Sequence, residues 1–322
     1  MPDTPPADNT DLVDEIKRTA DKLLADGTGR GEVKLIATAL KELRYCFKVF
    51  AGYRGTRKVA VFGSARTRPD HPAYLAAQQF GERMSDSGWM TMTGAAAGIM
   101  EAGHAGAKRD KSFGLSIILP FESAVNRVIH GDPKLMNLKY FFTRKLAFVK
   151  EADAVAVFPG GYGTHDELFE ALTLIQTGKS HLFPIVLVDQ PGGRYWKKWL
   201  AFVTDDLLGE GYISAEDLSL VRVTDSVDEA VDEVTRFYRV YHSMRFVRGQ
   251  LVLRLNRPLS AATMSRLAEE FADIAAGGRF EQSAMLGAEA NEPALKDLPR
   301  LRFGFKRHAM GRLRQLIDVL NE

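Results

Sequence analysis

The sequence predicts an α/β protein: a Rossmann-like, doubly wound parallel sheet, preceded by N-terminal helices and followed by a small C-terminal α+β extension. First, short apolar runs alternate with amphipathic segments from Lys58 to about Tyr241, which favours a parallel sheet with helices on both faces. Second, several of these runs end in glycine-bearing turns, the place where doubly wound folds bind ligands. Third, this alternation changes character after about Met244, which indicates an appended unit.

We therefore expect three regions, residues 1–54, 55–242 and 243–322. The first ten residues contain three prolines and two aspartates and predict a disordered leader. Two apolar stripes on either side of Gly27-Thr28-Gly29 then predict two helices: Leu12, Val13, Ile16, Leu23 and Leu24 in one, and Ile36, Leu40, Leu43, Phe47 and Phe50 in the other. These helices either cover the main domain or form a subunit interface.

The main domain is predicted to contain six strands. They are Val59–Phe62, Trp89–Thr93, Ser112–Leu119, Ala154–Phe158, Pro184–Val188 and Leu218–Val223. Helices are expected at about Pro72–Ser87, from Gly98, at Phe141–Glu151, from Thr164, at Trp196–Leu208, and after Ser226, which with Glu229 matches a capping box. In the extension we expect strands at Leu251–Leu253 and Leu301–Phe305, and helices at Ala261–Ala275 and Met310–Leu320.

The strand order decides which turns meet. In the usual doubly wound order, 3-2-1-4-5-6, the first and fourth strands are neighbours at the switch point. Here those two strands end at Gly63-Ser64-Ala65-Arg66 and at Pro159-Gly160-Gly161. The two turns are therefore predicted to face one crevice, and this convergence supports a nucleotide site.

The segment from Phe158 to Glu167 is the most informative stretch of the chain. An apolar strand ends in Pro159-Gly160-Gly161, and a helix follows whose first N–H groups have no intrahelical acceptor. With the helix dipole behind them, these donors form an anion site, and the glycines at 160, 161 and 163 remove the Cβ atoms that would keep a phosphate away. Glu167, in the first turn, is a candidate acid or base.

Several of these residues also have simpler explanations. Thr164 and Glu167 match a capping box, in which each satisfies an orphan amide of the other's backbone, although this does not explain three preceding glycines. The turn Thr93 to Glu101 also joins a strand to a helix and offers Gly94 to a ligand, yet its three alanines suit an ordinary tight loop. Arg144 and Lys145, near a helix start, are by themselves best explained as a solvated charged pair.

Composition excludes several classes of function. The net charge of +2, with 45% hydrophobic and 26% charged residues, indicates no nucleic-acid or membrane partner. Cys46 is the only cysteine, which excludes an intrachain disulfide and favours the cytoplasm. The seven histidines are scattered, so no metal is expected. No apolar run has the length of a membrane span. The arginines and aromatic residues between Arg236 and Arg254 are interpreted as an amphipathic helix rather than a nucleic-acid patch.

The stretch Pro159-Gly160-Gly161-Tyr162-Gly163-Thr164-His165-Asp166-Glu167 resembles the PGGxGTxxE signature of the LOG (Lonely Guy) family, whose members were long mislabelled lysine decarboxylases. Phe142-Thr143-Arg144-Lys145 resembles that family's upstream Arg-Lys element, and Phe62-Gly63-Ser64-Ala65 its first nucleotide turn. The resemblance covers roughly Arg57 to Tyr241.

The resemblance implies hydrolysis of the N-glycosidic bond of a nucleoside 5′-monophosphate, AMP or a cytokinin riboside monophosphate, to free base and ribose 5-phosphate. The family's catalytic arginine and glutamate correspond to Arg144 and Glu167. Gly160, Gly161, Gly163 and Thr164 would then bind the phosphate, and Gly63, Ser64, Gly94 and Lys145 the rest of the nucleotide. No cofactor is expected, and the protein is expected to be a homodimer or a higher homo-oligomer.

Two alternatives remain at this stage. Relatives have more glycine in the second turn, where this chain has Ala95, Ala96 and Ala97. Three methyl groups would narrow the cleft, so a nucleotide-binding or sensing module without turnover is the second hypothesis. A pyridoxal-phosphate decarboxylase follows only from the family's old name, and the sequence identifies no Schiff-base lysine for it.

Overall fold

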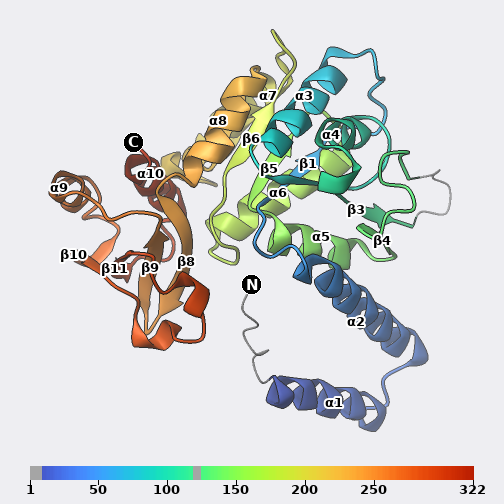
Figure 1. Ribbon diagram of the computed structural model, residues 1–322, viewed down its shortest axis with the longest axis horizontal. Helices are drawn as coiled ribbons and strands as arrows, with labels where there is room; N and C mark the ends of the chain where they lie inside the picture. The colour runs from blue at the N-terminus through green and yellow to red at the C-terminus, as the bar shows by residue number, and fades with distance from the viewer. Residues whose placement is uncertain (1–8, 119–124) are drawn as a thin grey trace. The chain divides into compact units, whose positions relative to one another are not determined.

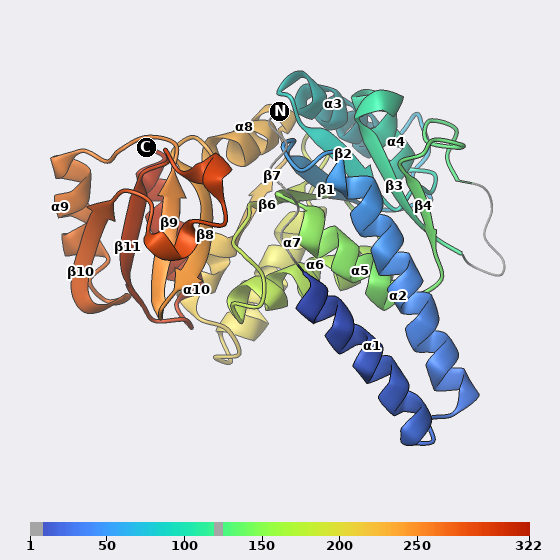
Figure 2. The ribbon, with the colours of Figure 1, turned by 60° about the horizontal axis from the view of Figure 1, so that its bottom comes forward.

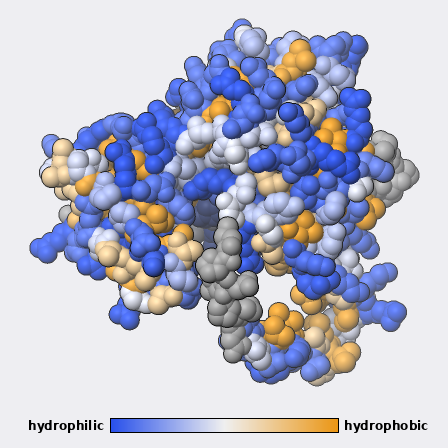
Figure 3. Space-filling view, in the orientation of Figure 1, coloured by the Kyte–Doolittle hydropathy of each residue, from blue (hydrophilic) through white to orange (hydrophobic). Residues whose placement is uncertain are grey.

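The computed structural model describes residues 9–118 and 125–322. It separates into two compact units, residues 1–51 and 52–322. In the first unit, α1 (Thr10–Ala25) and α2 (Arg30–Ala51) are the two predicted helices, whereas the predicted leader falls mostly on residues 1–8, outside the described residues. Apolar side chains remain at the surface of this unit (Figure 3), among them Leu12, Ile16 and Leu24, which are 55%, 50% and 79% exposed.

The second unit is built on a parallel sheet of seven strands (Figure 1). They are β1 (Lys58–Phe62), β2 (Met90–Thr93), β3 (Ser112–Ile117), β4 (Leu135–Leu138), β5 (Ala154–Val157), β6 (Ile185–Val188) and β7 (Val221–Thr224). Their order is β4-β3-β2-β1-β5-β6-β7. Without β4 this is the predicted order 3-2-1-4-5-6, so β1 and β5 are neighbours, with Phe62 paired to Val157.

Strand β4 was not predicted, and the predicted ends of other strands need correction. β4 lies at the sheet edge, where only alternate residues are buried, so it lacks the continuous apolar run of the central strands. The third strand was expected to reach Leu119, but β3 ends at Ile117 and residue 119 lies outside the described residues. The sixth strand was expected to begin at Leu218, but a 3₁₀ helix occupies Ala215–Leu220 and the strand begins at Val221.

Helices cover both faces of this sheet (Figure 2). On one face lie α3 (Pro72–Asp86), α4 (Ile99–Ala107) and α8 (Val227–Phe237), while α5 (Phe141–Glu151) and α6 (Tyr162–Gln176) cover the other. After β6 comes α7 (Tyr195–Phe202), which continues as a π-helical segment to Leu208. Helix α8 begins as predicted, because the Ser226 hydroxyl accepts from the Glu229 amide at 3.3 Å. The Glu229 carboxylate, however, accepts from the Thr224 hydroxyl at 2.6 Å.

The C-terminal extension is an antiparallel sheet of order β10-β11-β9-β8 with two helices. Its elements are β8 (Tyr241–Val247), β9 (Gln250–Leu255), α9 (Ala261–Glu270), β10 (Ala275–Ser283), β11 (Arg300–Phe305) and α10 (Met310–Leu320). Strands β8 and β10 were not predicted, and the predicted helix to Ala275 ends at Glu270.

The interpretation of Arg236 to Arg254 as an amphipathic helix is wrong. Helix α8 ends at Phe237, and a tight turn at Arg248 and Gly249, with φ values of +48° and +85°, joins β8 to β9. Arg254 does not extend into solvent, because its guanidinium pairs with the fully buried carboxylate of Glu289 at 2.8 Å.

Candidate active site

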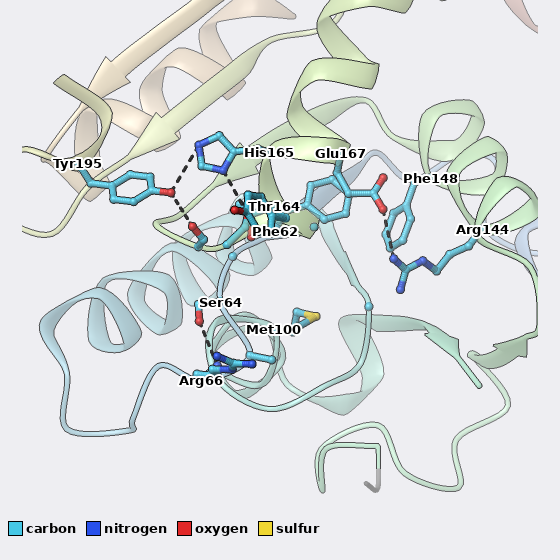
Figure 4. Close-up of a pocket in the computed structure, with 17 residues that line it drawn as sticks. Phe62, Ser64, Arg66, Met100, Arg144, Phe148, Thr164, His165, Glu167 and Tyr195 are labelled. Atoms are coloured by element: carbon cyan, nitrogen blue, oxygen red, sulfur yellow. Dashed lines mark hydrogen bonds and ion pairs between the residues drawn. The ribbon is translucent and has the colours of Figure 1, made fainter. Parts of the chain in front are cut away.

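A cavity of about 990 Å³ opens at the carboxyl ends of β1, β2 and β5 (Figure 4). The two predicted turns meet there, since the Ser64 amide donates to the Pro159 carbonyl at 3.1 Å. Of the predicted site residues, Gly63, Ser64, Gly94, Arg144, Gly160, Gly161, Gly163, Thr164 and Glu167 line the cavity, together with Phe62, Ala65, Arg66, Met100, Phe148, Tyr162, His165 and Tyr195. The strand order therefore brings the separate sequence motifs into one cleft.

Helix α6 starts two residues earlier than predicted, and this removes the capping-box explanation of Glu167. Tyr162 is its first residue and Gly161 its N-cap, with no side-chain cap. Thr164 is thus already helical, and its amide donates to the Gly161 carbonyl at 3.1 Å. The N–H groups of Tyr162 and Gly163 come first in the helix and have no intrahelical acceptor. Glu167 is free to interact elsewhere.

The three glycines of this turn serve two different purposes. A Cβ on Gly160 would overlap the Thr164 side chain and come within 2.9 Å of the Ser64 amide nitrogen, so glycine permits the two turns to approach. A Cβ on Gly161 or Gly163 would meet no atom within 4 Å. These two positions face open space in the cleft, which leaves the first amides of α6 accessible to an anion.

Glu167 and Arg144 form an ion pair at the wall of the cavity (Figure 4). The Arg144 Nη2 atom lies 3.2 Å from Glu167 Oε1, and the two side chains are only 14% and 7% exposed. Burial raises the pKa of Glu167, and the nearby charges of Arg144 and Lys145 oppose this rise without cancelling it. The Arg144 Nε atom is buried without a hydrogen-bond partner among the described residues. A partly buried carboxylate with a raised pKa suits acid–base chemistry.

Lys145 does not line the cavity. Its ammonium lies 2.6 Å from Glu170 Oε2, 2.9 Å from Asp166 Oδ2 and 3.5 Å from Glu167 Oε2. Burial lowers the pKa of Lys145, but the hydrogen bonds to Glu170 and Asp166 outweigh it and the pKa is raised. Lys145 therefore holds α5 against three carboxylates of α6, one of which is Glu167.

The turn after β2 presents only Gly94 to the cavity, and Ala95, Ala96 and Ala97 do not line it. Ala95 is fully buried and has a φ of +62°, although alanine seldom adopts a positive φ. Buried polar groups hold this loop: the Ala95 amide donates to the Thr93 hydroxyl at 2.9 Å, and the Asn126 side chain donates to the Ala96 carbonyl at 3.1 Å. The expectation that three methyl groups narrow the cleft is therefore not met by the geometry.

Sequence reasoning missed several residues of the cleft wall. His165 lies inside the recognised motif and Arg66 inside the first turn, but neither was predicted as a site residue. Tyr195 is the first residue of α7, and the segment before it carries no motif. Neither a metal cluster of histidine, cysteine and acidic side chains nor a helix able to span a membrane occurs in the described ranges 9–118 and 125–322.

Known proteins resemble this chain over the same region. A family model described as "Possible lysine decarboxylase" matches residues 88–234. A cytokinin riboside 5′-monophosphate phosphoribohydrolase of Mycobacterium tuberculosis is 30% identical over 181 residues, which are 55% of this chain and 92% of that protein. The chain belongs to the LOG family.

Some LOG family relatives match over a shorter stretch. A probable cytokinin riboside 5′-monophosphate phosphoribohydrolase of Oryza sativa subsp. japonica is 33% identical over 99 residues, so the match spans 31% of this chain and only 44% of that relative. Among solved structures, the molybdenum cofactor carrier protein of Chlamydomonas reinhardtii aligns with 56% of this chain and 97% of its own, at 19% identity and a TM-score of 0.40.

Proposed function

We propose that this protein hydrolyses the N-glycosidic bond of a nucleoside 5′-monophosphate, AMP or a cytokinin riboside monophosphate, to free base and ribose 5-phosphate. The observation that carries the proposal is a single cavity that holds both the open N-terminus of α6 and the buried Arg144–Glu167 pair. The names of the relatives support the same reaction class. An enzyme for this substrate needs a site that binds the phosphate and a carboxylate that can reach the anomeric carbon; the N-terminus of α6 supports the first requirement and Glu167 the second.

The 5′-phosphate is assigned to the first turn of α6. The amides of Gly161, Tyr162 and Gly163 are assigned to it, and the absence of Cβ atoms at Gly161 and Gly163 lets phosphate oxygens reach them. Thr164, which is 6% exposed, adds its hydroxyl beside them. Each charge-assisted hydrogen bond at such a site contributes roughly 1.5–3 kcal/mol.

Glu167 is the proposed catalytic carboxylate. As the bond to the base breaks, its electron pair leaves with the base and positive charge develops on the ribose, where an anionic carboxylate stabilises it. Glu167 then accepts a proton from the water that attacks the anomeric carbon, and the departing base takes up a proton from solvent to become neutral. Assistance by a carboxylate of this kind contributes about 10²–10⁴-fold. Arg144 orients Glu167 and compensates charge near the nucleotide. Lys145, held outside the cavity wall, acts through Glu167 rather than on the nucleotide.

The cavity wall gives no support to the second hypothesis, a nucleotide-binding module without turnover. That hypothesis depended on three alanines in the cleft, and the cavity wall contains Gly94 but not Ala95, Ala96 or Ala97. We retain hydrolysis as the function.

Self-association and a cytoplasmic location remain proposals. Helix α1 has no buried side chain in this structure, and its apolar stripe at Leu12, Ile16 and Leu24 is exposed. Covering such a stripe favours association with a second copy. Light scattering at several concentrations should give at least a dimer, and Ile16→Glu should shift the equilibrium toward the monomer. A monomeric wild-type protein at all concentrations contradicts this expectation.

The reaction is tested with a panel of nucleoside 5′-monophosphates, with release of free base followed by chromatography. At least one purine monophosphate should give base and ribose 5-phosphate in equal amounts, whereas the matching nucleoside, which lacks the phosphate, should react far more slowly. Failure of the whole panel, including AMP and cytokinin riboside monophosphates, overturns the proposed function.

A further inference from the structure

Two cleft residues without a family role hold the carbonyl groups of the glycine turn (Figure 4). The Tyr195 hydroxyl donates to the Gly160 carbonyl at 2.5 Å. His165 Nδ1 lies 3.1 Å from the Gly161 carbonyl, and because a carbonyl only accepts, Nδ1 carries the hydrogen. The other ring nitrogen, Nε2, lies 3.5 Å from the Tyr195 oxygen. Together these side chains fix two successive peptide groups.

Fixing a carbonyl also fixes the amide of the same peptide group. A trans peptide is planar, and its C=O and N–H bonds point in opposite directions. The Gly160 carbonyl is turned to Tyr195, so the Gly161 N–H points the other way, and the Gly161 carbonyl likewise aims the Tyr162 N–H. Glycine has no Cβ to restrict its backbone. Without these two side-chain donors, the Gly160 carbonyl would lose its bond to Tyr195, and the Gly161 carbonyl would keep only the bonds from the backbone amides of Thr164 and His165 at 3.1 and 3.3 Å. The turn would then gain freedom at the point where its amides must converge on an anion.

Tyr195 is itself held firmly in place. Its backbone amide donates to Asp189 Oδ2 at 2.6 Å, and Asp189 is 4% exposed just after β6. Its ring packs edge-on against Trp196 at a centroid distance of 4.8 Å, and the His165 ring lies 5.9 Å from it. The segment after β6 therefore holds the Tyr195 hydroxyl against the turn that follows the neighbouring strand β5.

We propose that Tyr195 and His165 are positioning residues that preorganise the Gly161 and Tyr162 amides for the 5′-phosphate. The proposal rests on the proposed function in taking the phosphate as the ligand of α6. Neither side chain needs to touch the breaking bond. They strengthen binding of the phosphate, and this binding is equally strong in the ground state and in the transition state. Loss of either side chain should therefore raise KM and leave kcat unchanged.

The primary test is Tyr195→Phe, which removes the hydroxyl and keeps the ring packed on Trp196. KM for the best nucleoside 5′-monophosphate should rise about threefold to tenfold, as expected for loss of one hydrogen bond, with kcat within about twofold. Kd for ribose 5-phosphate, measured by calorimetry, should rise by the same factor. Tyr212→Phe, at a tyrosine that is 74% exposed, is the matched control and should change neither value.

His165 is tested by a pair of variants. His165→Leu removes the donor and should raise KM and the ribose 5-phosphate Kd about threefold to tenfold. His165→Asn places an amide N–H near the position of Nδ1 and should restore both values to within about twofold. If His165 only supported the fold, His165→Leu would lower the unfolding temperature, would not raise KM while leaving kcat unchanged, and would not be rescued by asparagine.

The outcomes separate this proposal from the proposed reaction. Unchanged Kd for ribose 5-phosphate in both Tyr195→Phe and His165→Leu overturns the positioning role even if the enzyme hydrolyses its substrate. If the wild-type protein binds ribose 5-phosphate but releases no base, the reaction is wrong, and the Kd comparison still decides the positioning role. If it binds no ribose 5-phosphate at millimolar concentration, the positioning role is overturned, whereas release of base still decides the reaction.

Discussion

Glu167→Gln should slow the release of base without lowering the stability of the fold. The substitution keeps the shape of the side chain and removes its charge. At 3.2 Å, the attraction between Glu167 and Arg144 amounts to about 5 kcal/mol for an effective dielectric constant near 20. The pKa of Glu167 is nevertheless raised, chiefly by burial, so the ionised carboxylate is less favourable in the folded protein than in water. The charge at this position therefore lowers the stability of the fold.

The sign of the effect follows from proton linkage. A group whose pKa is raised on folding stabilises the protein at acidic pH, and this contribution is lost as the pH rises through the folded-state pKa. At neutral pH, Glu167→Gln should therefore unfold at the same temperature as the wild-type protein or at a higher one. Base release should fall about 10²–10⁴-fold, which corresponds to roughly 3–5 kcal/mol in the barrier, while ribose 5-phosphate still binds.

The matched control is Glu170→Gln on the same helix. Glu170 pairs with Lys145 at 2.6 Å but does not line the cavity, so base release should stay within about threefold of wild type. Both variants are measured by chromatographic assay of base release and by thermal unfolding at pH 7. The reasoning is refuted if Glu167→Gln retains more than a tenth of the wild-type rate, or if Glu170→Gln loses as much activity.

Three further predictions concern the scaffold. Gly63→Ala should lower the free energy of unfolding by about 1–3 kcal/mol, because the new Cβ would lie 2.6 Å from Ile99 Cγ2. Gly55→Ala is the control, since its Cβ would meet no atom within 4 Å. Equal urea midpoints for the two variants would contradict this prediction. Burial lowers the pKa of His104 from its ordinary value of 6.5 to about 4, so the unfolded chain binds a proton at a higher pH than the folded protein does. The free energy of unfolding should therefore fall by on the order of 3 kcal/mol as the pH is lowered from 6.5 to 4. Urea titrations between pH 7 and pH 4 should show this loss in the wild-type protein and not in His104→Gln. Glu289→Ala should cost about 3–5 kcal/mol, because the carboxylate lies between the buried guanidinium groups of Arg254 and Arg300 at 2.8 and 3.1 Å. Glu281→Ala should cost under about 1 kcal/mol, because the side chains of Glu281 and its partner Arg302 are 50% and 34% exposed. A similar loss in both variants would count against the role of burial.

The regular part of the fold could be predicted because it depends on local patterns. The central strands β1, β5 and β6 are buried on both faces and therefore read as continuous apolar runs. Helices α5 and α10 begin and end where their sequence predicted. Edge strand β4 and strand β8 were missed because many of their residues are only partly buried, so neither has a clear apolar run.

The sequence by itself determined the seven-strand sheet's central order, the glycine turn at Pro159–Gly163 and the candidates Arg144 and Glu167. Only the tertiary structure decided what these candidates contact. It showed that Glu167 pairs with Arg144 instead of capping α6, that Lys145 lies off the cavity wall among carboxylates of α6, and that the alanines after Gly94 also lie off this wall. It also brought Tyr195 to the Gly160 carbonyl across 35 residues of chain. Local periodicity fixes elements, whereas contacts between distant residues depend on how the elements pack.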